Sequence, residues 1–270
     1  MTLYLIGIGL YDYKDVTIRG LEIIKSCDTV YLENYTSILA SPTEEIEGFY
    51  GREVILASRD LVEKQAEEKL IQPAKKRDIA LLVVGDPFGA TTHTDIMLRA
   101  KKAGVQVRTV FNASVLNAVG VTGLELYKFG KTTSIVYPDG NWLAHTPYDV
   151  IKMNREHGLH TLCLLDIKVA EPSMEDLRKG SGKPQPSRYM TVAEGLDVLG
   201  RIEKLRGENI ISHDTLVVGV ARLGHPDMKI IAGTLRELKE VDFGSPLHSL
   251  IVPGKLHHIE EDALKQFNKK

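Results

Sequence analysis

The sequence predicts an α/β protein made of two α/β domains, the first of them built on a mostly parallel sheet. Short apolar runs alternate with stretches of helical period through the first half of the chain, which is typical of parallel strands joined by crossover helices. Near residues 123–130 the rhythm changes, and strand-like runs follow one another with fewer helices between them. A chain of 270 residues, 43% of them hydrophobic, can bury more than one core. We therefore expect an N-terminal domain over residues 1–125 and a C-terminal domain with a mixed sheet over residues 126–270.

The N-terminal domain is predicted to contain five strands, each a short apolar run: Leu3 to Gly9, Thr29 to Glu33, Glu53 to Ala57, Ile79 to Val84 and Val105 to Val110. The helical stretches between them are Thr17 to Ser26, a segment opening at Ser41, Leu61 to Lys75, and His93 to Lys102. Ser41 stands three residues before Glu44, with Pro42 at the expected first helical position, and this combination predicts a helix start. Gly104 is expected to cap the last helix.

The C-terminal domain is predicted to contain five more strand-like runs: Ser134 to Tyr137, Thr161 to Ile167, Leu216 to Ala221, Met228 to Gly233 and His248 to Val252. Its clearest helix is Thr191 to Arg206, whose apolar side chains fall on one face. The stretch from Glu171 to Arg188 contains glycines, prolines and basic residues without an apolar period, which predicts a surface insertion loop. Such a loop is either simply solvated or grips a substrate.

Charge and composition narrow the classes of function. A net charge of −2 gives no general basic field for nucleic acid or for an anionic membrane. The two cysteines, Cys27 and Cys163, lie in apolar stretches with no second cysteine nearby, which favours a reducing, cytoplasmic setting. The first apolar run is too short for a membrane span and has no signal-peptide cleavage site. No zinc-type Cys/His spacing, His-Glu-x-x-His helix or NTPase phosphate loop is present, so we expect no metal site.

The first motif is the Gly7-Ile8-Gly9 turn, which follows a strand and precedes a helix, as in dinucleotide-binding enzymes. Asp12 occupies the place of the third glycine of that fingerprint. A carboxylate there would repel a pyrophosphate from the helix N-terminus. Glu33, about twenty residues further on at a strand end, keeps a nicotinamide or flavin enzyme as an alternative.

The second motif is Gly85-Asp86-Pro87, where a buried strand ends and a loop of small residues begins. Ligands of open α/β sheets gather at the carboxyl ends of the strands, so Asp86 is well placed to accept a hydrogen bond from a ligand. Equally, Asp-Pro can simply form a turn, with Thr92 or Thr94 capping the next helix. The residues alone do not decide between these interpretations.

The third motif is Asn112-Ala113-Ser114-Val115, again a strand end followed by small residues and a helix. Small side chains allow close packing of helix on sheet, and they also let a ligand approach backbone amides. Ser114 lacks the flanking glycines of a nucleophile elbow, which disfavours a serine hydrolase.

Taken in order, these segments resemble the tetrapyrrole methylase family of S-adenosylmethionine enzymes over nearly the whole chain. The shared features are the Gly7-x-Gly9 turn with Asp12, Thr17-Ile18-Arg19-Gly20-Leu21, Gly85-Asp86-Pro87 and Ala232-Gly233-Thr234-Leu235. Two segments depart from the porphyrin methylases of that family. Ala90-Thr91-Thr92-His93 stands in place of an arginine-glycine turn, and Asn112-Ala113-Ser114 in place of a proline-glycine turn.

These departures resemble the diphthine synthase branch, as do Tyr127-Lys128-Phe129-Gly130, Leu164-Leu165-Asp166-Ile167-Lys168 and Asp242-Phe243-Gly244-Ser245-Pro246-Leu247-His248. The insertion loop and Leu162-Cys163-Leu164-Leu165-Asp166 are similar to the eukaryotic type, the diphthine methyl ester synthases. The resemblance implies methylation of one histidine of translation elongation factor 2 that already bears a 3-amino-3-carboxypropyl group. Three methyls go to the amine, and eukaryotic members also methylate the carboxylate, before amidation to diphthamide.

The resemblance also implies a homodimer that binds S-adenosylmethionine in the cleft between the two domains. Matched by motif, the cofactor contacts of the N-terminal domain would be Leu10, Asp86, Gly89, Ser114 and Val115. Those of the C-terminal domain would be Leu165, Leu223 and His248. Without the resemblance, Leu10, Val115, Leu165 and Leu223 would be interpreted as packing residues and His248 as a satisfied polar residue.

Methyl transfer from a sulfonium is an in-line displacement with an activated donor, so the protein mainly has to position and desolvate the reactants. An apolar cleft would also lower the pKa of the acceptor amine. We therefore expect catalysis by proximity and name no catalytic residue. The alternatives are a corrin or porphyrin methyltransferase of the same fold and a non-catalytic protein that binds the elongation factor.

Overall fold

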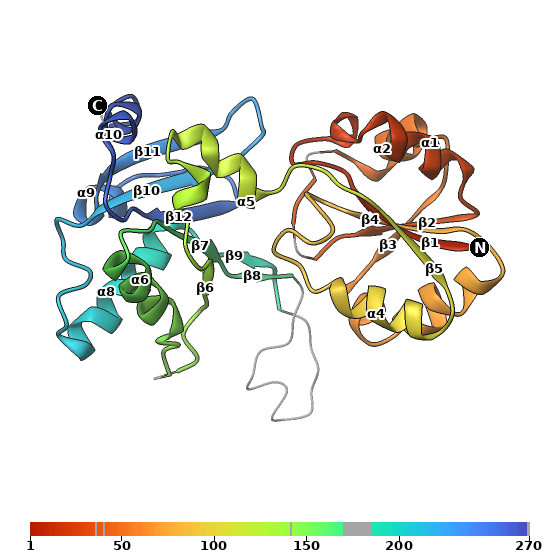
Figure 1. Cartoon of the computed structure of the whole chain (residues 1–270), viewed down its shortest axis with the longest axis horizontal. Coiled ribbons are helices and arrows are strands. Elements are labelled where there is room, and N and C mark those ends of the chain that lie inside the picture. Colours follow the sequence, from red (N-terminus) through yellow and green to blue (C-terminus); the bar gives the residue numbers. More distant parts are fainter. Residues whose placement is uncertain (36, 40, 141, 170–184, 269–270) are drawn as a thin grey trace. The chain divides into compact units, whose positions relative to one another are not determined.

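The computed structural model describes residues 1–35, 37–39, 41–140, 142–169 and 185–268. They form two compact units, Met1–Ala118 and Val119–Lys270, each with its own five-stranded sheet (Figure 1). Most of the predicted insertion loop, residues 171–184, lies outside the described residues. Within the described ranges, no helix is both long and apolar enough to cross a membrane.

The first unit contains an all-parallel sheet with the strand order β3-β2-β4-β1-β5. Its strands are β1 (Thr2–Gly7), β2 (Thr29–Glu33), β3 (Val54–Ala57), β4 (Ile79–Val83) and β5 (Gln106–Val110). Figure 1 shows α1 (Ile18–Ser26) and α2 (Thr43–Tyr50) on one face and α4 (Thr94–Lys102) on the other. Because both faces are covered, the central strand β4 is buried at every residue. The predicted parallel sheet is confirmed, and its carboxyl ends meet at one edge.

The helix α1 begins and ends as predicted, but two predicted side-chain caps of this unit are absent. The N-cap of α2 is Pro42 rather than Ser41, and no side chain caps that helix. Likewise His93 is the N-cap of α4, and neither Thr92 nor Thr94 caps it. In both cases the helix begins within one or two residues of the predicted cap, a difference of the size expected at helix ends.

The single helix expected over residues 61–75 is also wrong. The structure has α3 (Arg59–Glu63), then a π-helical turn (Glu67–Ile71) and a 3-10 turn (Pro73–Lys75). Pro73 lacks an amide proton and opens the last turn, where that proton is not needed. Val62, Leu70, Ile71 and Ala74 are all buried, so the apolar period was real although the helix is broken.

The second unit contains a mixed sheet with the order β11-β10-β12-β7-β6. Its strands are β6 (Thr133–Ile135), β7 (Thr161–Leu165), β10 (Leu216–Ala221), β11 (Lys229–Thr234) and β12 (His248–Val252). Only β6 and β7 run parallel among these pairs. The short antiparallel pair β8 (Ile167–Lys168) and β9 (Arg188–Tyr189) flanks the insertion. The predicted mixed sheet is confirmed.

Among the described residues of this unit, the α-helices are α6 (Thr146–Glu156), α8 (Val192–Arg206), α9 (Leu235–Lys239) and α10 (His258–Lys265). The predicted helix α8 starts with a capping box between Thr191 and Glu194 and ends at Gly207. α6 was not predicted. It buries Tyr148 and Ile151 in the same core as Leu196 and Leu199 of α8.

Candidate cofactor-binding site

A backbone bridge joins the carboxyl ends of β1 and β4. The amide of Gly85 donates to the carbonyl of Gly9 at 2.6 Å, and the amide of Gly9 donates back at 3.3 Å. Both glycines have positive φ, 81° and 83°, which residues with side chains rarely adopt. The predicted contacts Leu10 and Asp86 follow these glycines directly, so the bridge places both at the same edge of the sheet.

Two carboxylates shape the loop after β1. The Oδ2 atom of Asp15 accepts hydrogen bonds from the amides of Leu10 at 3.2 Å and Tyr11 at 2.8 Å. Asp12 accepts from the amide of Lys14 and caps a short 3-10 turn. The amides that could have faced a pyrophosphate are therefore turned toward a carboxylate, which argues against a dinucleotide site here.

Glu33, the residue that would bind the ribose of a dinucleotide, also argues against such a site. The residue is only 2% exposed, and its Oε2 lies 2.7 Å from Nε2 of His93. A buried, paired carboxylate is not available to a ribose hydroxyl. The nicotinamide or flavin alternative thus loses the residue that kept it open.

Asp86 closes its own turn and ties that turn to β5. Its Oδ1 accepts from the amide of Phe88 at 2.9 Å, and its Oδ2 accepts from the amide of Asn112 at 3.0 Å. A carboxylate has about four acceptor sites, so each oxygen retains capacity for a ligand donor. Asp86 therefore makes the turn, and it also lies half-buried at the sheet edge where it can accept from a ligand. The two interpretations of this residue do not exclude each other.

Gly89 and Ser114 touch across this edge. A Cβ added at Gly89 would lie 2.5 Å from Oγ of Ser114, so only glycine allows this approach. Ser114 is buried, and its Oγ accepts from the amide of Leu116 at 3.3 Å. Val115 begins the short helix α5 (Val115–Ala118) immediately afterwards. The five contacts predicted in the first unit thus come from three neighbouring loops at one edge of the sheet.

Asn112 holds these loops together, although the sequence marked it only as part of the Asn112-Ala113-Ser114 segment and not as a site residue. Its Nδ2 donates to the carbonyls of Gly7 and Asp15, each at 3.0 Å, and its Oδ1 accepts from the amide of Ala113 at 2.7 Å. The signal in the sequence was a polar residue two positions after the end of a strand. Its partners lie about a hundred residues away, so they could not be named from that position.

The three contacts predicted in the second unit also meet at one sheet edge. Leu165 ends β7, His248 begins β12, and Leu223 follows the end of β10. Antiparallel pairing puts Ala221 opposite His248 and Leu164 opposite Ser249. The carboxyl ends of β7 and β10 therefore flank the amino end of β12, and all three side chains are buried there.

His248 presents an unused acceptor at this edge. Its Nε2 lies 3.1 Å from the carbonyl oxygens of Gly244 and Ser245, so this nitrogen carries the proton and donates. Burial of the ring holds the pKa of His248 below its ordinary value, and the charge of Arg222 lowers it further. Nδ1 is therefore a lone-pair acceptor, and it is buried without a hydrogen-bond partner.

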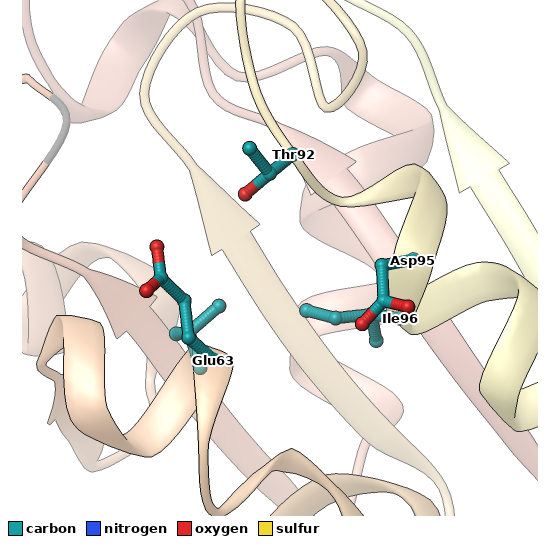
Figure 2. Close-up of a pocket in the computed structure, with 5 residues that line it drawn as sticks. Glu63, Thr92, Asp95 and Ile96 are labelled. Carbon is teal, nitrogen blue, oxygen red and sulfur yellow. The ribbon is translucent and has the colours of Figure 1, made fainter.

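A separate pocket of about 180 Å³ opens beside the start of α4. Figure 2 shows Glu63 of α3 on one side of it and Thr92, Asp95 and Ile96 on the other, and Val62 completes the lining. None of the predicted cofactor contacts lines this pocket. Over the described residues, no group of three or more histidine, cysteine, aspartate or glutamate side chains is arranged to hold a metal ion.

Comparison with known proteins places these features in a family. The family described as Tetrapyrrole (Corrin/Porphyrin) Methylases matches residues 2–239. The diphthine methyl ester synthase of Homo sapiens is 50% identical over 98% of this chain and 95% of its own length. The enzyme of the same name from Dictyostelium discoideum is 47% identical over 100% of this chain and 99% of its own.

A solved structure gives the same answer for the fold. A crystal structure of diphthine synthase superimposes with a TM-score of 0.85 at 36% identity, covering 99% of this chain and 96% of the other. The chain therefore belongs to the tetrapyrrole methylase family, in its diphthine methyl ester synthase branch, and is a methyltransferase of diphthamide biosynthesis.

Proposed function

We propose that this chain transfers methyl groups from S-adenosylmethionine to the 3-amino-3-carboxypropyl-histidine of translation elongation factor 2. Three methyls go to the amine and one to the carboxylate, which gives diphthine methyl ester. The observation that supports this most strongly is the run of relatives about 50% identical over nearly the full chain that bear the name of this activity.

The residues at the two sheet edges fit S-adenosylmethionine. That cofactor offers hydrogen-bond donors in its ammonium, its adenine amine and its ribose hydroxyls. The orphaned Nδ1 of His248 is a buried acceptor that needs such a donor, since leaving it unpaired costs roughly 1–3 kcal/mol. The half-used carboxylate of Asp86 is a second acceptor, and Leu10, Val115, Leu165 and Leu223 provide apolar surface. The proposal keeps the residues of each edge as cofactor contacts.

When bound, the cofactor supplies a methyl group already activated by the positive sulfonium. The chain's own residues then have to bind, orient and exclude water. Asp86 and His248 accept hydrogen bonds, while buried leucines at the second edge keep that region dry. Low polarity lowers the pKa of the acceptor amine by disfavouring its cation, so the free amine forms without a dedicated base. The acceptor carboxylate is ionised already.

The proposal further includes a homodimer working in the cytoplasm on elongation factor 2, without nucleic acid or membrane as a partner. These elements follow from the family resemblance and from the near-neutral net charge. The insertion at residues 171–188 is our candidate for part of the surface that contacts the factor.

The test is transfer of radiolabelled methyl from S-adenosylmethionine. Elongation factor 2 bearing the 3-amino-3-carboxypropyl-histidine is offered beside a corrin or porphyrin precursor, each with the purified chain. We expect label in the elongation factor alone. Label in the tetrapyrrole would favour the alternative methylase, and cofactor binding without transfer to the factor would point to a non-catalytic binding protein.

A further inference from the structure

A buried glutamate–histidine pair lies in the described part of each unit. In the first unit Nε2 of His93 lies 2.7 Å from Oε2 of Glu33, and in the second Nε2 of His160 lies 2.8 Å from Oε1 of Glu260. All four side chains are essentially inaccessible to solvent. The pairs differ at the second nitrogen of the ring, and this difference sets the charge of each histidine.

His160 is neutral. Its Nδ1 accepts a hydrogen bond from the amide of Gly254 at 3.0 Å, so that nitrogen has no proton. Nε2 carries the single proton and donates to Glu260. Burial holds the pKa of His160 below its ordinary value, and the nearby Lys128 ammonium acts in the same direction.

His93 has acceptors at both nitrogens. Nδ1 lies 3.0 Å from the carbonyl oxygen of Pro87, which can only accept, and Nε2 faces the carboxylate of Glu33. With Glu33 ionised, both partners can only accept, so both ring nitrogens carry protons and the ring is an imidazolium paired with a carboxylate. Burial opposes this charge, but the hydrogen bond and charge of Glu33 and the Pro87 carbonyl outweigh burial and raise the pKa of His93.

Other charged groups around the pair do not change this assignment. Tyr35, at the end of β2, is buried and neutral because burial and the charge of Glu33 raise its pKa. In α3, the Arg59 guanidinium lies 5.3 Å from the centre of the Tyr35 ring. Arg59 and Glu63 carry opposite charges and shift the pKa of Tyr35 in opposite directions. Asp95 of α4 faces the separate pocket and pairs with Arg99. These α3 and α4 groups are partly exposed and of mixed sign, so water screens their effect on the buried ring.

The ion pair holds the turn that carries two of the predicted cofactor contacts. The Pro87 carbonyl accepts from His93 and from the Thr91 hydroxyl, which fixes the turn from the side of α4. Asp86 fixes the same turn from the side of β5 through Asn112. We propose that Glu33 and His93 are positioning residues, whose buried imidazolium–carboxylate pair sets the geometry of residues 85–89 and thereby the affinity for S-adenosylmethionine. The ligand named here rests on the proposed function, whereas the charge of His93 does not.

The first arm of the test is a long-range ¹⁵N–¹H spectrum of the unmodified protein at pH 6.5, with the nine histidines labelled. We expect both ring nitrogens of His93 to be protonated, and only Nε2 of His160. An unprotonated nitrogen in His93 would overturn the ion pair. This arm needs no variant and no cofactor.

The second arm compares His93→Gln with the matched variant His160→Gln by calorimetric titration with S-adenosylmethionine. Glutamine cannot bridge two partners as the imidazole does, so each variant loses a buried contact and its thermal midpoint falls. We expect His93→Gln alone to raise Kd, by roughly 3- to 10-fold, since one anchoring hydrogen bond of the turn is lost. Equal Kd values in the two variants would overturn the positioning role. Absence of binding by the unmodified chain would instead refute the proposed function.

Discussion

The contact between Gly89 and Ser114 gives the sharpest prediction for the first sheet edge. In Gly89→Ala the new Cβ would lie 2.5 Å from Oγ and 2.7 Å from Cβ of Ser114, and 3.3 Å from Cβ of Asp86. Ordinary contact begins near 3.4 Å, so the Ser114 side must move by about 0.7 Å. Overpacking of this kind costs roughly 1–3 kcal/mol of folding stability.

The same displacement acts on three predicted cofactor contacts at once. We expect Gly89→Ala to raise the Kd for S-adenosylmethionine by at least about tenfold, because each misplaced contact is worth roughly 0.5–1.5 kcal/mol. Calorimetric titration gives Kd, and urea unfolding monitored by circular dichroism gives the stability. An unchanged Kd in a variant that has lost stability would refute the assignment of this edge to the cofactor.

Two further variants separate the clash from a general glycine effect. Gly48 lies within α2, and a Cβ there meets nothing within 4 Å, so Gly48→Ala should stabilise the protein by about 0.5–1 kcal/mol without changing Kd. Ser114→Gly removes the side-chain atoms that the new Cβ at position 89 would strike. It should therefore restore most of the stability lost in Gly89→Ala, which a double-mutant cycle measures.

Three other predictions concern pH and loop anchoring. Although burial opposes the charge, the pKa of His93 is raised above 6.5 by its pairing with Glu33. The stability that this pairing contributes is therefore fully present below pH 6.5 and is lost as the pH rises through the folded-state pKa. Urea unfolding at successive pH values should show this loss of stability in the unmodified protein and not in His93→Gln. Against the opposing effect of burial, hydrogen bonds from Lys128 and two backbone amides lower the pKa of Glu260 to about 2, so its contribution is present above pH 4.5 and is lost between about pH 4.5 and 2. A free energy of unfolding that does not fall between about pH 4.5 and 2 would contradict this low pKa of Glu260. Asn112→Ala removes two donors and one acceptor and should cost roughly 1–3 kcal/mol in urea unfolding, with a weaker cofactor titration.

Much of the fold could be predicted because its signals are local. Each N-terminal strand is a short apolar run, and the inner strands β2, β4 and β1 are buried almost throughout, so the apolar runs alone located the strands. The start of α8 could be predicted in the same way, because its capping residues Thr191 and Glu194 are close in sequence. The break between residues 63 and 73 was not, because the buried positions there keep a helical spacing while the backbone changes its hydrogen-bond pattern.

The site could be predicted only in part for a related reason. Strand ends followed by glycine and small residues mark where a ligand can approach, and that pattern indicated Asp86, whereas Ser114 was named from the family resemblance. Asn112 and His93 act through partners far away in sequence, such as Gly7 and Glu33, so no local pattern reveals them. The chemistry of a buried histidine depends on what faces its second nitrogen, which only the fold determines.

The most direct test of the proposed activity is the intact mass of elongation factor 2 bearing the 3-amino-3-carboxypropyl-histidine, after incubation with this chain and S-adenosylmethionine. We predict the addition of four methyl groups, one of them removed by mild alkaline hydrolysis because it is an ester. Addition of only three would contradict the methyl ester assignment and leave plain diphthine synthesis. No change in mass, with cofactor binding confirmed by calorimetry, would contradict the proposed acceptor itself.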